Sequence, residues 1–157
     1  MTLSTPLARK CDAKRHDRLD YSRNPNSNSR ETIDRVHCEE GYLCDVCGKD
    51  VENIWESDLY LRYVIGLIDP ETLHTTKERH ITCNPSLAQF IVHPEFPPVT
   101  AAEDFCKESL DSKFVFEREQ LLTRGWQRLK ELAALEGLSI LEYPLPEVQE
   151  RMKKEAE

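Results

Sequence analysis

Four side chains that bind metals well occur in this chain as two pairs of similar spacing. Cys44 and Cys47 form a C-x-x-C pair, and His80 and Cys83 form an H-x-x-C pair 32 residues further on. Each pair can face one ion when the backbone turns tightly between its two members. Together they make a Cys₃His set, which is one of the closed ligand sets of structural zinc. The sequence therefore predicts a structural Zn²⁺ held by these four residues.

The residues around the first pair favour metal binding over redox chemistry. Gly48 follows Cys47 directly and supplies the positive φ with which a chain leaves such a turn. A thioredoxin-like pair would instead open a helix, and no helical apolar period begins here. The first ten residues contain no apolar signal segment, so we expect a metal-ligand pair and not part of a disulfide framework.

Other side chains near the two pairs are alternate ligands. Cys38 or His37 can take the place of His80, because both lie shortly before the first pair. His74 is a further alternate, either as a ligand or as a proton-transfer group. A second hypothesis is a metal-dependent hydrolase that uses His74, His80 or His93 around an ion with an open coordination position.

The residues that flank the pairs resemble the zinc knuckle of zinc ribbons and treble-clef fingers. The run Cys44-Asp45-Val46-Cys47-Gly48-Lys49 has the order of a knuckle, and Asn84-Pro85 places a helix cap directly after the last ligand. The resemblance covers about residues 44–92 and implies a structural metal. It does not imply one activity, because treble clefs occur in nucleases, ribosomal proteins, transcription factors and interaction modules.

The most apolar run, residues 59–68, lies between the two pairs. Its length and its aromatic and β-branched residues favour a strand, while a helix capped by Ser57 is the alternative. Asp69-Pro70 is typical of a helix start and predicts a short helix to about residue 76. A further helix is expected from about 85 to 92, where His93-Pro94 ends it.

Residues 113–135 predict a long amphipathic helix, with Ser112 at its start and Gly137 after its end. Gly125 inside it costs about 1 kcal/mol relative to Ala and leaves room for a close backbone approach. An extended segment is expected at 138–143. The apolar stripe of the helix is interpreted as core or, alternatively, as a surface for a protein partner. That stripe is Val115, Leu122, Trp126, Leu129 and Ala133.

The charge of the chain is uneven. Residues 1–36 carry eight Lys and Arg against five Asp and Glu, whereas residues 37–157 carry 13 against 24. We expect a disordered or loosely packed basic arm over 1–36, a single zinc-binding domain over 37–148 and a charged, fraying tail over 149–157. An acidic body is unsuited to a phosphate backbone, but the arm can make weak, salt-sensitive contacts with nucleic acid.

These patterns predict an α+β fold, a small zinc-centred domain with a knuckle, a short sheet and a long C-terminal amphipathic helix. No run approaches 18 apolar residues, so no membrane span is expected, and the cytoplasm is the expected compartment. The leading hypothesis is a protein with structural zinc that serves as an interaction or regulatory module. The alternatives are a metal-dependent hydrolase or nuclease-like enzyme, and nucleic-acid binding through the arm.

Overall fold

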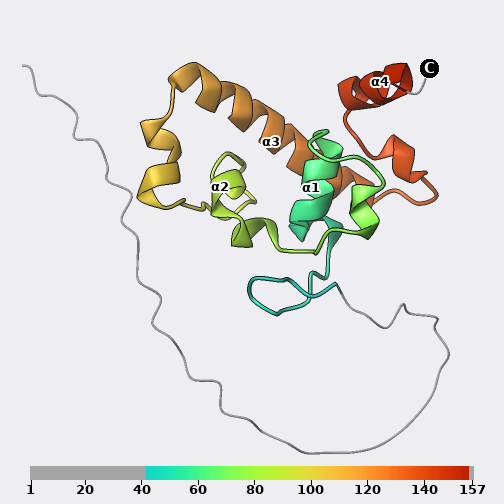
Figure 1. Ribbon diagram of the computed structural model, residues 1–157, viewed down its shortest axis with the longest axis horizontal. Helices are drawn as coiled ribbons and strands as arrows, with labels where there is room; N and C mark the ends of the chain where they lie inside the picture. Colours follow the sequence, from blue (N-terminus) through green and yellow to red (C-terminus); the bar gives the residue numbers. More distant parts are fainter. Residues whose placement is uncertain (1–41, 156–157) are drawn as a thin grey trace, which may run out of the picture.

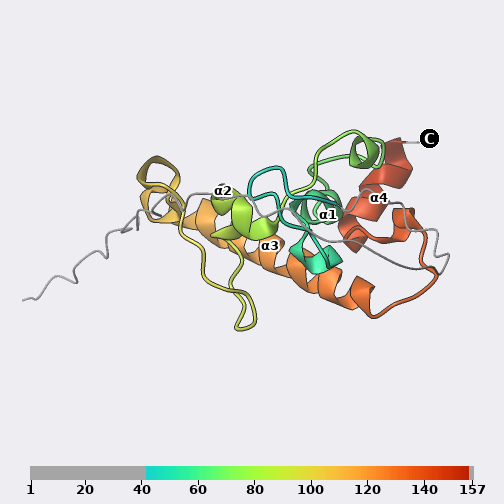
Figure 2. The same cartoon turned by 90° about the horizontal axis from the view of Figure 1, so that it is seen from below.

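The computed structural model describes residues 42–155, and within them the chain is organised along one long helix, α3 (Ser112–Ala133). Helix α1 (Asp58–Val64) lies across α3, and the segment that contains α2 (Pro85–Ala88) follows along the same side (Figures 1 and 2). Helix α4 (Pro146–Glu155) ends the described chain. Six 3₁₀ turns connect the helices: Ile54–Glu56, Thr72–His74, Ile81–Cys83, Glu103–Phe105, Lys107–Ser109 and Ile140–Glu142.

The prediction of an α+β fold with a short sheet is wrong for the described residues. Extended pairing within residues 42–155 is limited to two isolated antiparallel bridges, one between Leu43 and Asp50 and one between Ser57 and His80. Each bridge joins a single pair of residues, so no strand forms. The described chain is helical, and the predicted long C-terminal helix is present as α3.

Residues 59–68 do not form the favoured strand, because local and tertiary interactions both select a helix. The Ser57 side chain accepts a hydrogen bond from the Tyr60 amide, which caps α1. Asp58 and Arg62 form an i,i+4 ion pair of 2.9 Å along the helix. Leu61 and Val64 lie one turn apart in the hydrophobic core. The alternative of a helix capped by Ser57 is therefore confirmed.

Other predicted elements are shorter than expected. Asp69 does cap the turn that follows it, since its carboxylate accepts from the Thr72 amide at 2.9 Å, but the turn is a 3₁₀ turn of three residues. Helix α2 ends at Ala88 instead of about residue 92. The Gln89 side chain turns away to bond the Phe105 carbonyl and the Lys107 amide. These long-range bonds hold the chain after α2 in a different direction.

The chain after α3 is also helical where an extended segment was expected. Residues 138–143 contain a 3₁₀ turn, which Ser139 and Glu142 stabilise by a capping box. Most of the segment 149–157, expected to be a fraying tail, lies in α4. The arm predicted over residues 1–36 lies outside the described residues. Among the described helices, none has the length and apolarity that a bilayer crossing requires.

The stripe of α3 packs into the core. Leu122, Trp126 and Leu129 are buried there together with Leu61 and Val64 of α1. The helix begins with Asp111 as its cap, one residue before the expected Ser112, because the Asp111 carboxylate accepts from the Lys113 and Phe114 amides. Since the stripe is covered by the chain itself, a protein partner would have to contact other residues.

Gly125 marks the closest approach between α1 and α3. A Cβ added there would clash with Ile65 and would lie 3.1 Å from Leu61 Cδ1. The expected close approach at this glycine is therefore present. The helix gives up about 1 kcal/mol of propensity at Gly125, and the tight crossing of α1 offsets that loss.

Gly125→Ala is expected to destabilise the protein by about 1–2 kcal/mol, because overpacking at the helix crossing outweighs the gain in helix propensity. Urea unfolding measures the change. Gln127→Ala, at an exposed position of the same helix, is the control and should change stability by no more than about 0.5 kcal/mol. A Gly125→Ala protein as stable as the wild type would contradict the packing described here.

Candidate metal centre

The two predicted ligand pairs come together in space. One ligand atom from each of Cys44, Cys47, His80 and Cys83 lies within 4.8 Å of the other three, a grouping that could hold a metal ion. Cys47 Sγ and His80 Nδ1 are 3.4 Å apart. Typical bond lengths place sulfur and nitrogen about 3.6 Å apart around a tetrahedral zinc ion. The spacing of the pair is therefore close to that of a tetrahedral site.

The first pair lies in a tight hairpin. The Cys44 amide donates to the Lys49 carbonyl at 2.8 Å, and the Gly48 amide donates back to the Cys44 carbonyl at 2.9 Å. Gly48 has a φ of 70°, and no atom lies within 4 Å of where its Cβ would be. The glycine is therefore required by its backbone conformation and not by lack of space.

The second pair is delivered by an extended segment that runs beside the start of α1. His80 bridges Ser57, and the Asp58 amide donates to the Arg79 carbonyl at 2.9 Å. The same segment reaches the knuckle, because the Asp45 amide donates to the Glu78 carbonyl at 3.0 Å. Both ligand pairs are thereby tied to one short stretch of main chain.

A buried carboxylate fixes that stretch. Both oxygens of Glu78 accept from the Ser57 hydroxyl, at 2.9 and 2.8 Å, and one of them also accepts from the Arg79 amide at 2.9 Å. Glu78 is buried with Ser57 at the beginning of α1. A carboxylate at this position stabilises the helix N-terminus and sets the position of His80 two residues later.

The orientation of the His80 ring favours metal binding through Nδ1. Its other nitrogen, Nε2, lies 3.0 Å from the Asp50 carbonyl oxygen. A carbonyl can only accept, so Nε2 carries the proton and donates. The neutral ring then presents the free lone pair of Nδ1 to the cysteine sulfurs. A hydrogen bond of this kind to a main-chain carbonyl is the usual support of a metal-ligating histidine.

Main-chain amides around Cys44 stabilise its thiolate. Burial by itself would raise the pKa of the Cys44 thiol, but hydrogen bonds from the amides of Cys47, His80 and Val46 outweigh it and lower the pKa to about 6. The His80 amide lies 3.4 Å from the sulfur. Cys44 is thus prepared to be an anionic ligand at neutral pH.

The third thiol has the opposite tendency. Burial and the neighbouring sulfurs of Cys44 and Cys47 raise the pKa of Cys83 to about 12, because a further negative charge among sulfur atoms is unfavourable. A divalent cation among the four ligand atoms would stabilise all the thiolates together. The electrostatics of the site are those of a set of ligands that requires a cation to ionise fully.

The alternate ligands are not brought into this group. His37 and Cys38 lie outside the described residues. His74 is exposed on its 3₁₀ turn, and His93 stacks on the Trp126 ring with centroids 4.9 Å apart. Among the described residues, neither His74 nor His93 belongs to the four-residue group.

Two parts of the site could not be recognised from ligand spacing. The Asp50 carbonyl is a main-chain group and leaves no trace in the residue pattern. Glu78 is one acid among many in an acidic chain, and its only signal is its place two residues before a candidate ligand. Their contribution becomes visible once both pairs are seen against the start of α1.

Comparison with known proteins adds no relative: no family model, curated protein or solved structure matches the chain. The resemblance to zinc knuckles therefore remains one of motif. The argument for function depends on the geometry of the four ligands and their surroundings.

Gly48→Ala is expected to weaken metal binding, because a side chain at a φ of 70° is strained by about 1–2 kcal/mol and the knuckle must relax. Competition with a chromogenic zinc chelator measures the affinity. Gly137→Ala is a matched control, since Gly137 has a φ of 76° and equally open surroundings but lies after α3. Both variants should lose similar stability, and only Gly48→Ala should lose affinity. Equal affinities for the two variants would contradict the role given to the knuckle.

Proposed function

We propose that the protein binds one Zn²⁺ through Cys44, Cys47, His80 and Cys83, and that this ion is structural. The observation that carries the proposal is the approach of all four ligand atoms to within 4.8 Å of one another. Three sulfurs and one imidazole are a ligand set typical of structural zinc. Soft thiolate ligands also disfavour magnesium, calcium and manganese, which prefer oxygen.

A structural role fits better than catalysis. A catalytic zinc keeps three protein ligands and one position for water, whereas a structural zinc is closed by four. Here four ligands are present, so a hydrolase would have to release one of them. The other histidines proposed for a hydrolase, His74 and His93, do not belong to the group.

The ion would supply much of the stability of this region. The knuckle, residues 42–51, is joined to the rest by few interactions, among them the Asp45–Arg79 ion pair of 3.2 Å and the bond between the Asp45 amide and the Glu78 carbonyl. Structural zinc contributes roughly 10–16 kcal/mol in small peptides, which is comparable with the net stability of a whole domain. The metal would therefore hold the knuckle against α1.

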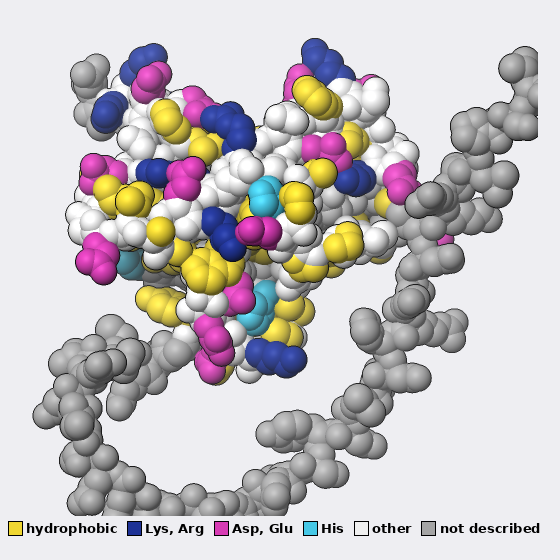
Figure 3. Space-filling model, turned by 180° about the vertical axis from the view of Figure 1, so that it is seen from behind, with side chains coloured by type: hydrophobic (Ala, Val, Ile, Leu, Met, Phe, Trp, Pro, Cys, Tyr) yellow, Lys and Arg dark blue, Asp and Glu magenta, His cyan; other side chains and the backbone are white. Residues whose placement is uncertain are grey.

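A closed ion that performs no chemistry supports the role of an interaction or regulatory module for the protein. The apolar stripe of α3 is buried, so a protein partner would bind elsewhere on the described surface. Nucleic-acid binding through the basic arm is the second candidate, and the charge of residues 1–36 favours it. On the face shown in Figure 3, basic and acidic side chains are interspersed, and neither sign forms a continuous field.

Protein purified without chelator is expected to contain one zinc per chain, and Cys44→Ser or Cys83→Ser should reduce both zinc content and soluble yield. Each substitution removes a thiolate ligand, and folding of the knuckle is coupled to the metal. Elemental analysis gives the zinc content. X-ray absorption should show three sulfurs near 2.3 Å and one nitrogen near 2.0–2.1 Å, the usual zinc distances.

His74→Asn is the control for these variants, because it removes an exposed histidine outside the ligand group. It should retain full zinc content. Absence of zinc in the wild-type protein would overturn the proposal, and a coordinated water in place of one protein ligand would favour the hydrolase.

A further inference from the structure

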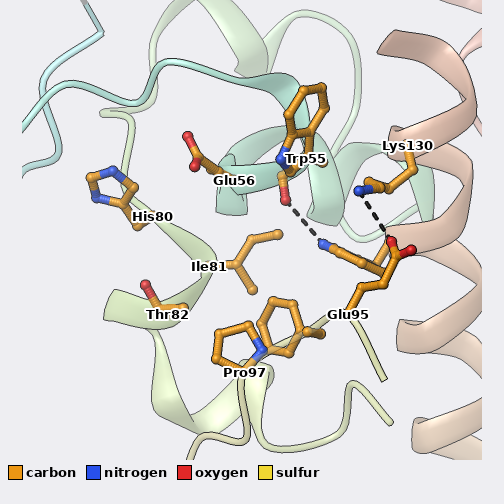
Figure 4. A pocket seen from close by; sticks show the side chains of 10 residues that line it. Trp55, Glu56, His80, Ile81, Thr82, Glu95, Pro97 and Lys130 are labelled. Carbon is orange, nitrogen blue, oxygen red and sulfur yellow. Dashed lines mark hydrogen bonds and ion pairs between the residues drawn. The ribbon is translucent and has the colours of Figure 1, made fainter. Parts of the chain in front are cut away.

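A cavity of about 240 Å³ lies beside the metal centre. Its aromatic walls are Trp55, Phe96 and Trp126, which come from three separate segments, and Glu56, Glu95 and Lys130 are its charged residues. Figure 4 shows these charged side chains and the wall formed by His80, Ile81 and Thr82. Sites for drug-sized ligands typically measure about 300–1,000 Å³, so this cavity fits a smaller group.

The cavity already attracts a cation of the protein itself. The Lys130 ammonium lies 5.3 Å from the centroid of the Trp55 ring and 5.4 Å from that of the Trp126 ring. It also forms an ion pair of 3.2 Å with Glu95 (Figure 4). Indole faces attract ammonium groups within about 6 Å through their negative quadrupole. The walls and the carboxylate therefore suit an ammonium on an apolar stem.

The charge at the cavity is not balanced by Lys130. Glu56 and Glu95 contribute two negative charges against its single positive charge. The Lys130 side chain is 41% exposed and that of Glu95 is 62% exposed, so their ion pair is open to water and weak. Lys130 can therefore move aside, and the cavity then presents two carboxylates and two indoles to another cation.

We propose that this cavity receives the ammonium group of a lysine side chain on a partner protein. The inference rests on the proposed role of an interaction module and adds the chemistry of its partner. The lysine stem would lie against the indoles, and its ammonium would replace that of Lys130 beside Glu95. The acidic excess of residues 37–157 also favours a basic partner.

Both tryptophans of the chain line the cavity, so intrinsic fluorescence reports on it directly. The zinc-loaded full chain is titrated with lysine capped as N-acetyl and N-methylamide. The matched neutral probe is the same molecule acetylated on its Nζ. We expect a saturable change with the first probe only, at roughly millimolar affinity, because one side chain offers few contacts.

Lys130→Ala should tighten binding of the capped lysine by about three- to tenfold, since it removes both a competitor and a like charge. Glu95→Gln should weaken it by a similar factor. Lys113→Ala removes another ion-paired lysine of α3, which is 84% exposed and does not line the cavity, and it should change nothing. Circular dichroism verifies that each variant is folded.

Each result bears on one proposal. No saturable change in either wild type or Lys130→Ala, in protein that carries its zinc, would overturn the lysine site and leave the zinc proposal standing. Binding retained in protein without zinc would overturn the zinc proposal alone. Equal binding of the neutral probe, or preference for a capped arginine, would overturn the assignment of a lysine ammonium as the occupant.

Discussion

The described structure depends on the buried carboxylate of Glu78 at the start of α1. It accepts from the Ser57 hydroxyl and the Arg79 amide, while its main-chain carbonyl accepts from the Asp45 amide. One residue thus joins the helix start, the segment that bears His80 and the knuckle. A buried carboxylate is tolerated only with such a set of donors, so these three parts must assemble together or not at all.

This junction explains how two ligand pairs that are 32 residues apart can serve one site. The intervening chain is not a flexible insertion, because it contains α1 and two 3₁₀ turns. The bridge between Ser57 and His80 brings its two ends back together. The entropy of closing the loop is therefore met largely by packing α1 on α3, and the metal has less of that cost to offset.

Local signals predicted much of the site but little of the architecture. The ligand pairs, the Ser57 cap and the glycine of the knuckle depend on near neighbours, and all three could be read from spacing. The run 59–68 was assigned to a strand because its residues suit either period, and packing of α1 on α3 decides for the helix. The end of α2 is set by Gln89, whose partners lie 16 and 18 residues away. Such long-range bonds are absent from any local pattern.

His80 belongs both to the metal centre and to the wall of the cavity. Its ring faces the sulfurs through Nδ1, and it forms that wall with Ile81 and Thr82, which lie between it and Cys83. A bound ion would fix both ends of this four-residue segment. Recognition is costly when a surface must be ordered on binding, and a wall held in advance avoids that cost. A zinc ion that performs no chemistry would thereby still contribute to binding, because it holds one side of the cavity rigid.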